Sequence, residues 1–239
     1  RTCGEDTDRS SLDLVGLQQE LIERIYATGK PVVVVLVTGR PLGVEWVAEH
    51  VPALLNAWEP GMYGGQAVAE ILYGKVNPSA KLPITMPRTA GQIQMIYNHK
   101  PSQYFHPYVV TPSTPLYPFG YGLTYTSFEY SDLMVIEKGD GVDVTLTVTN
   151  TGNFDAAEVV QIYVGEDNPC VARPAKELKG YDKVFIPKGE SAVVNVRLPE
   201  SAFAFYDVDI HDWRINPGTF TIMVGASSQD IKLKEHIIL

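Results

Sequence analysis

Residues 30–41 read Lys-Pro-Val-Val-Val-Val-Leu-Val-Thr-Gly-Arg-Pro, and this stretch decides the fold of the first half of the chain. Its apolar run, 32–37, lacks the alternation of polar and apolar residues that marks a half-exposed strand. We therefore expect an inner strand that is covered on both faces, as in parallel sheets. Helical patterns flank this strand, and a second apolar run at 53–58 follows the second helix. The order of strand, helix and strand predicts a parallel α/β sheet.

Three helices are expected around these two strands, at residues 17–26, 44–51 and 64–74. The first has apolar residues at helical spacing and ends at Gly29, which suits a left-handed C-terminal cap. Pro52 stops the second helix because proline cannot donate a backbone hydrogen bond. The first half of the chain is thus predicted to alternate between helix and strand.

From Phe128 onward the pattern becomes all-β. Residues 142–148 alternate cleanly between apolar and polar side chains, and further short strands are expected at 159–164, 183–186, 192–198 and 219–224. About seven strands in about 110 residues is the size of a small antiparallel sandwich of the immunoglobulin or fibronectin type. No Cys–Trp–Cys arrangement is present in the sequence, so an antibody-type domain is excluded.

We divide the chain into three parts: 1–87 in an α/β domain, 88–125 as a loop and linker, and 126–239 as the β-sandwich. The middle part is rich in Pro, Gly and Tyr and shows no helical or strand periodicity. Flexible linkers are poor in aromatic residues. We therefore expect an ordered loop that its aromatic side chains hold in place.

The composition restricts the classes of partner. The chain has 45% hydrophobic and 20% charged residues and a net charge of −9. Nucleic acids are not expected to bind, because their phosphates require basic patches. No apolar run approaches the roughly 20 residues that a membrane helix needs. A soluble globular protein is the prediction.

Cysteine and histidine usage gives no sign of a metal site. The two cysteines, Cys3 and Cys170, lie far apart, and the five histidines show no metal-ligand spacing. The Gly-rich stretches lack the spacing of dinucleotide or phosphate loops, so no cofactor is expected. No Gly-x-Ser-x-Gly elbow occurs either. Carboxylate chemistry is what remains.

The polar segment 1–13 carries four carboxylates, Glu5, Asp6, Asp8 and Asp13. A solvated loop with helix-capping acids explains them, and they would repel one another if crowded in a dry site. Glu5 is the strongest catalytic candidate by position. It follows Gly4 on a loop that could be aimed away from the sheet.

Further motifs extend along the chain in a specific order. They are Gly4-Glu5-Asp6-Thr7-Asp8-Arg9, Gly29-Lys30-Pro31, Gly39-Arg40-Pro41, Ala57-Trp58-Glu59-Pro60-Gly61, Gly74-Lys75-Val76-Asn77-Pro78-Ser79-Ala80-Lys81-Leu82-Pro83 and Tyr117-Pro118-Phe119-Gly120-Tyr121-Gly122-Leu123-Thr124-Tyr125. One such motif would be weak, but their common order is specific. On these motifs the whole chain resembles the C-terminal portion of glycoside hydrolase family 3, the β-glucosidase and β-xylosidase family.

The resemblance implies a fold and a role. Residues 1–87 would be the second half of a flavodoxin-like α/β sandwich domain, followed by a fibronectin type III-like domain. In this family a preceding β/α barrel carries the nucleophilic Asp, and the α/β domain carries the general acid/base Glu in a Gly-Glu-x-x-(x)-Arg segment. That pattern assigns the acid/base to Glu5, with Asp6 and Asp8 as alternatives. The barrel and its nucleophile are not in this sequence, so the chain alone is expected to be inactive.

The resemblance also implies a substrate, an oligosaccharide or an aryl or alkyl β-glycoside. We expect a retaining, exo-acting β-glucosidase that removes terminal non-reducing β-D-glucosyl residues; β-xylosidase and β-N-acetylglucosaminidase activities are the alternative specificities. Tyr104 and Phe105 are expected to stack on the leaving-group sugar, although a loop wedged between two domains explains them too.

The barrel is the expected partner, on the same polypeptide or a separate one. A homodimer stays open, as does the compartment, for which a secreted or periplasmic location is favoured over the cytoplasm. The rival hypothesis is a non-catalytic carbohydrate-binding or scaffold module, in which Glu5 is only a loop acid. An enzyme part needs a barrel partner with a nucleophilic Asp, whereas a binding module does not.

Overall fold

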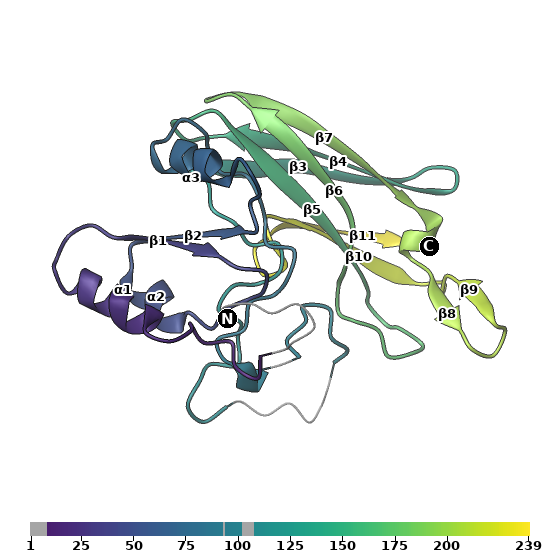
Figure 1. Cartoon of the computed structure of the whole chain (residues 1–239). Coiled ribbons are helices and arrows are strands. Elements are labelled where there is room, and N and C mark those ends of the chain that lie inside the picture. Colours follow the sequence, from purple (N-terminus) through teal and green to yellow (C-terminus); the bar gives the residue numbers. More distant parts are fainter. Residues whose placement is uncertain (1–8, 93, 102–107) are drawn as a thin grey trace. The chain divides into compact units, whose positions relative to one another are not determined.

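The computed structural model describes residues 9–92, 94–101 and 108–239, which form two compact units (Figure 1). In the described part, the first unit contains residues 9–76, 84–92, 94–95 and 108–117, and the second contains 77–83, 96–101 and 118–239. Each unit therefore combines segments that are far apart in the sequence. Among the described residues, no helix is both long and apolar enough to cross a membrane.

The first unit is built on two parallel strands, which confirms the expected order of strand, helix and strand. Its elements are α1 (Gln18–Tyr26), β1 (Val33–Val37), α2 (Glu45–His50), β2 (Ala53–Trp58), α3 (Gly64–Leu72) and the short 3-10 helix η1 (Ala90–Gln92). The glycine after α1, Gly29, has a φ of 71°, the left-handed conformation that ends many helices.

Strand β1 buries one of its faces. Val34 and Leu36 are 8% and 6% exposed and pack against residues of α1, α2 and β2. Val33 and Val37, which point the other way, are 48% and 68% exposed. The expectation that both faces are covered is therefore not met within the described residues, because the core of this unit gathers on the side of Val34 and Leu36.

The second unit is a β-sandwich of seven strands in its described residues, as the sequence pattern predicts. One sheet has the order β11-β10-β5-β6 and the other the order β3-β4-β7, and all pairings are antiparallel. The strands are β3 (Phe128–Glu137), β4 (Gly141–Asn150), β5 (Ala156–Glu166), β6 (Glu177–Ile186), β7 (Ser191–Pro199), β10 (Thr219–Gly225) and β11 (Ile231–Ile238). A 3-10 helix, η2 (Glu200–Ala202), and a hairpin of β8 (Phe205–Asp207) and β9 (Asp212–Arg214) lie between β7 and β10.

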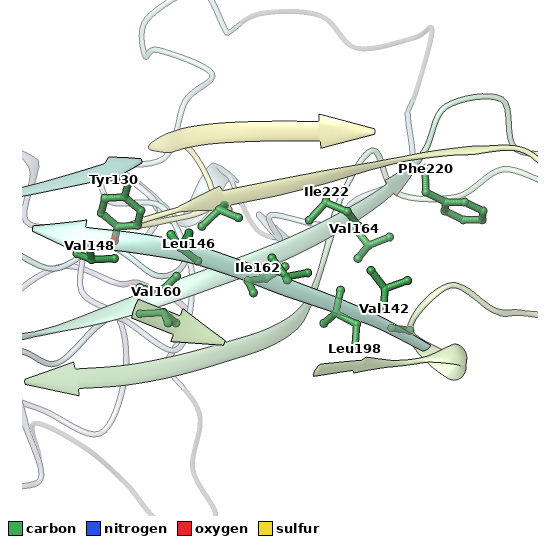
Figure 2. Packing of buried hydrophobic residues seen from close by; sticks show 14 of the residues in the cluster. Tyr130, Val142, Leu146, Val148, Val160, Ile162, Val164, Leu198, Phe220 and Ile222 are labelled. Atoms are coloured by element: carbon green, nitrogen blue, oxygen red, sulfur yellow. The ribbon is translucent and has the colours of Figure 1, made fainter. Parts of the chain in front are cut away.

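The core of the sandwich is formed by the inward-facing residues of its strands (Figure 2). Leu146 on β4, Ile162 on β5 and Ile222 on β10 are each at most 1% exposed. In β4 the buried positions alternate with partly exposed ones, as the period of two in the sequence predicts. Burial of this kind stabilises by roughly 1.5–3 kcal/mol per large apolar side chain, so this cluster is the main source of the unit's stability.

Two segments outside the sandwich strands pack onto it. In the loop that begins at Asn77, the side-chain Oδ1 accepts hydrogen bonds from Thr124 Oγ1 at 2.6 Å and from Tyr125 N at 2.8 Å. Leu82 N donates to Tyr121 O, and Gly120 N donates to Leu82 O, both at 2.8 Å. Residues 77–83 and 118–125 therefore form a strap on the sandwich. The sequence-based domain ranges, 1–87, 88–125 and 126–239, stay a prediction, since compactness groups residues by contact.

Candidate active site

The carboxyl ends of β1 and β2 meet at one edge of the parallel sheet, the edge at which α/β proteins bind ligands. After β1, the hydroxyl of Thr38 donates to Arg40 O at 3.1 Å and accepts from Arg40 N at 3.2 Å. Thr38 N donates to Trp58 O at 3.0 Å and so joins the two strand ends. The turn after β1 is thus fixed by its own side chain and by the neighbouring strand.

Trp58 closes β2 in a strained conformation. Its φ is 53°, in the left-handed region that bulky residues rarely adopt. The register of the two strands shifts between Leu36 and Val37, so that Leu36 pairs with Asn56 and Val37 with Trp58. Strain of this kind costs on the order of 1–3 kcal/mol and persists only where the surrounding structure holds it. The sheet edge is therefore locally distorted and firmly held.

The polar N-terminal segment is tied to the loop between β1 and α2. Gly43 N donates to Leu12 O at 2.8 Å, and Arg9 Nη2 donates to Asp13 O at 2.8 Å. Ser11 Oγ donates to Asp13 Oδ2 at 2.6 Å and accepts from Asp13 N at 3.0 Å. The chain therefore reaches the carboxyl edge of the sheet a few residues after the Gly-Glu motif.

Arg88 connects this region to the aromatic loop. Its Nη1 donates to Glu45 Oε1 at 2.7 Å, and its Nε donates to Thr114 O at 3.0 Å. The backbone N of Arg88 donates to Gln92 Oε1 at 2.7 Å, while Gln92 Nε2 donates to Pro112 O at 2.8 Å. Gly43 fits against this corner because a Cβ there would lie 2.9 Å from Arg88 O. The later part of the loop is thus ordered and attached to α2.

The candidate catalytic and binding residues of the sequence analysis lie outside the described residues. This holds for Glu5 and its alternatives Asp6 and Asp8, and equally for Tyr104 and Phe105. Their roles stay predictions. Within the ranges that the structure does describe, no three His, Cys, Asp or Glu side chains gather as a metal site requires.

One polar residue at this sheet edge was missed by the sequence reasoning. Both polar atoms of the Asn56 side chain are buried and have no hydrogen-bond partner among the described residues. Leaving a buried polar group unpaired costs about 1–3 kcal/mol, so Asn56 needs an explanation. The signal was present in the sequence, since Asn56 is the only polar residue in the apolar run 53–58.

The architecture defines the class of protein. A parallel α/β sheet with polar loops at its carboxyl edge, followed by a fibronectin-like sandwich, is typical of a multidomain protein whose chemistry resides in the α/β part. The chain belongs to glycosyl hydrolase family 3: residues 1–125 match the C-terminal domain of that family, and residues 158–228 match a fibronectin type III-like domain.

Similar proteins match almost the whole chain. A β-xylosidase of Formosa agariphila is 42% identical over 98% of this chain and 33% of its own length. A periplasmic β-glucosidase of Salmonella typhimurium is 36% identical over 95% of this chain and 32% of its own length. This chain therefore spans about a third of the length of these curated relatives.

Solved structures give the same result. A β-glucosidase of Erythrobacter marinus superimposes with a TM-score of 0.91 at 43% identity, over 97% of this chain and 31% of its own chain. A β-glucosidase of Listeria innocua in complex with glucose has a TM-score of 0.91 at 34% identity, over 98% of this chain and 34% of its own. The expected combination of an α/β domain and a fibronectin type III-like domain is confirmed.

Proposed function

We propose that this chain is the C-terminal part of a retaining, exo-acting β-glucosidase and that it supplies the general acid/base, Glu5. The observation that carries the proposal is the position of the segment that follows Glu5. Residues 9–13 are hydrogen-bonded to one another and to Gly43 at the carboxyl edge of the sheet, where ligands bind in α/β folds. Membership of the family and the Gly4-Glu5 motif support the assignment.

The proposed role follows from the chemistry of retaining glycosidases. The protonated Glu5 carboxyl would donate its proton to the leaving glycosidic oxygen while a nucleophilic Asp attacks the anomeric carbon. The Glu5 carboxylate would then accept a proton from the water that hydrolyses the glycosyl-enzyme, and that proton restores the acid. The two carboxyl groups must be about 5–5.5 Å apart, so the nucleophile has to come from a neighbouring barrel. The chain by itself would be inactive.

The substrate is proposed from what similar proteins are named for. The solved relatives named above are β-glucosidases, and curated relatives are named β-xylosidase or β-glucosidase. We assign terminal β-D-glucosyl residues as the substrate and keep β-xylosides as the alternative. The contrast between glucose and xylose is one hydroxymethyl group, which the residues of the barrel would recognise.

Tyr104 and Phe105 are proposed to contact the leaving group. They lie in a segment between residues that the structure holds on both sides, because Tyr97 and Arg88 anchor the chain before it and Gln92 binds the chain after it, at Pro112. Aromatic rings stack on the apolar face of a sugar, so replacing either by Ala should weaken binding of disaccharides more than of glycosyl fluorides.

The acid/base assignment is tested in the enzyme that combines this chain with its barrel, by comparing Glu5→Gln and Glu5→Ala with the unmodified protein. For a glucoside with a poor leaving group, loss of the acid should cost on the order of 10²–10⁴ in rate. A glucoside with a good leaving group needs little protonation, so its glycosylation step should be far less affected. Azide should restore turnover to Glu5→Ala, because it replaces the water that needs the general base.

Asp6→Asn and Asp8→Asn serve as matched controls because they remove neighbouring charges and leave Glu5 intact. Small and equal effects of Glu5→Gln on both substrates would reject Glu5 as the acid/base. If Asp6→Asn or Asp8→Asn instead shows the dependence on the leaving group, that residue takes the role. If the chain binds β-glucan without any barrel, the carbohydrate-binding alternative gains the support.

A further inference from the structure

The β-sandwich holds both ends of the aromatic loop through one aromatic cluster. The Tyr97 ring stacks on the Phe119 ring with centroids 4.4 Å apart and planes 18° from parallel. The same Tyr97 ring meets Tyr163 of β5 edge-on, at 5.8 Å and 74°. Tyr97 precedes residues 98–118 and Phe119 follows them, so the stack closes this loop at its base.

Hydrogen bonds fix the cluster on the sandwich. Leu178 N of β6 donates to the Tyr97 hydroxyl oxygen at 3.0 Å, and Ser228 N donates to Phe119 O at 2.9 Å. The Tyr163 side chain is fully buried, and its hydroxyl donates to Gln161 Oε1 at 2.7 Å. Each end of the loop is thus attached to strands or loops of the sandwich by a ring contact and by a hydrogen bond.

Gln161 extends this network to the strap. Its Nε2 donates to Gly120 O at 3.0 Å and to Ala226 O at 2.8 Å, and the residue is only 3% exposed. A Cβ at Gly120 would collide with this amide, so the backbone approaches Gln161 as closely as a glycine allows. The side of the sandwich formed by β5 and β6 is therefore shaped to receive residues 97 and 119–120.

We propose that Tyr97 is a positioning residue through which the β-sandwich sets the leaving-group side of the active site. Closing a loop at its base removes conformational freedom that would otherwise be lost when substrate binds. The loop closed by Tyr97 and Phe119 contains Tyr104 and Phe105, so this inference rests on the proposed function. It gives the fibronectin type III-like domain a part in substrate binding that is more than support.

The test compares Tyr97→Leu, Tyr97→Phe and Phe119→Leu in the enzyme that contains the barrel. Tyr97→Leu and Phe119→Leu break the ring stack from its two ends, whereas Tyr97→Phe keeps the stack and removes only the hydroxyl. Aromatic pairs of this kind correspond to about a 2- to 12-fold change in an equilibrium constant. We expect Tyr97→Leu and Phe119→Leu to raise KM for a disaccharide by about that factor. Tyr97→Phe should stay within about twofold of the unmodified enzyme.

Two readouts separate positioning from loss of stability. A glycosyl fluoride has no leaving-group ring, so its kcat/KM should stay nearly unchanged in Tyr97→Leu. Amide hydrogen exchange in residues 98–117 should become faster in Tyr97→Leu and Phe119→Leu. Val194→Ala, in the buried core and away from the loop, controls for lower stability, and Tyr181→Ala controls for loss of an exposed tyrosine on β6.

The inference is overturned if Val194→Ala, at a matched loss of melting temperature, reproduces the change in KM. It is also overturned if the disaccharide and the fluoride are affected equally, or if exchange in the loop does not change. If Glu5 variants keep full activity while Tyr97→Leu still shows the expected exchange and KM pattern, the acid/base assignment fails and the positioning role of Tyr97 stands.

Discussion

Lys81 Nζ lies 3.0 Å from Glu158 Oε1, and the two side chains are only 12% and 4% exposed. Lys81 also donates to Gly122 O at 3.1 Å, and the Tyr130 hydroxyl donates to Glu158 Oε1 at 3.1 Å. This buried ion pair joins the strap to the face of β5. A segment that family comparison assigns to the α/β domain is therefore held by the sandwich.

Replacing Lys81 by Met should destabilise the sandwich unit by about 3–5 kcal/mol, because Glu158 is left as a buried charge without a cation. The measurement is urea unfolding followed by far-ultraviolet circular dichroism. Lys81→Met combined with Glu158→Gln should recover much of the loss, since no unpaired charge remains. Lys232→Met, which breaks an exposed pair with Asp230, is the control and should cost less than about 1 kcal/mol. A loss for Lys81→Met as small as that of the control would contradict the prediction.

The second unit should lose stability at alkaline pH. Burial raises the pKa of Tyr130, Tyr163, Tyr97 and Tyr121 above the ordinary value, and the carboxylate of Glu158 raises the pKa of Tyr130 further. The folded state therefore keeps these phenolic protons at pH values where the unfolded state has released them. The free energy of unfolding should be constant below about pH 10 and fall as the pH rises above it.

Urea midpoints and tyrosinate absorbance measured over the same pH range test this. Tyr130→Phe should reduce the alkaline loss of stability, because one group with a raised pKa is removed. Tyr181→Phe, at an exposed position, should leave the profile unchanged. Titration of all tyrosines near pH 10 without loss of stability would show that the buried phenols have ordinary pKa values.

Gly120→Ala should destabilise the strap and the loop base together. The φ of Gly120 is 79°, and a Cβ there would collide with the Gln161 amide. Gly189→Ala is a matched control, because Gly189 has a φ of 76° but open space around its Cβ position. Both changes carry the backbone cost of about 1–2 kcal/mol, and Gly120→Ala should cost a further 1–3 kcal/mol or so for the collision. Equal melting temperatures for the two variants would show that Gln161 can move aside.

Asn56→Leu should stabilise the first unit of this chain by about 1 kcal/mol or more, because it replaces a buried amide without a partner by an apolar side chain of similar size. Thermal unfolding of the chain alone provides the measurement, and Asn56→Asp, which would bury a charge, should be destabilising. A loss of stability in Asn56→Leu would instead mean that the amide is paired in the protein as it exists in solution.

The sequence predicted the secondary structure well where the hydrophobic period was long. Residues 32–37 and 53–58 form β1 and β2, and the alternation at 142–148 corresponds to β4. It was less successful for burial, since Val33 and Val37 look like core residues in the sequence and are exposed in the described chain. Periodicity reports which residues favour a strand, whereas burial depends on what other chain segments cover each face.

By itself, then, the sequence determined the order of elements, the α/β and β-sandwich classes and the position of the Gly4-Glu5 motif, because these depend on local spacing and residue type. Only the tertiary structure decided which segments share a core. The pairing of Lys81 with Glu158, and of Tyr97 with both Phe119 and Tyr163, joins residues that are far apart along the chain. Such contacts leave no periodic signal, because a buried charge or a ring stack is stabilised by its partner in space and not by its neighbours in sequence.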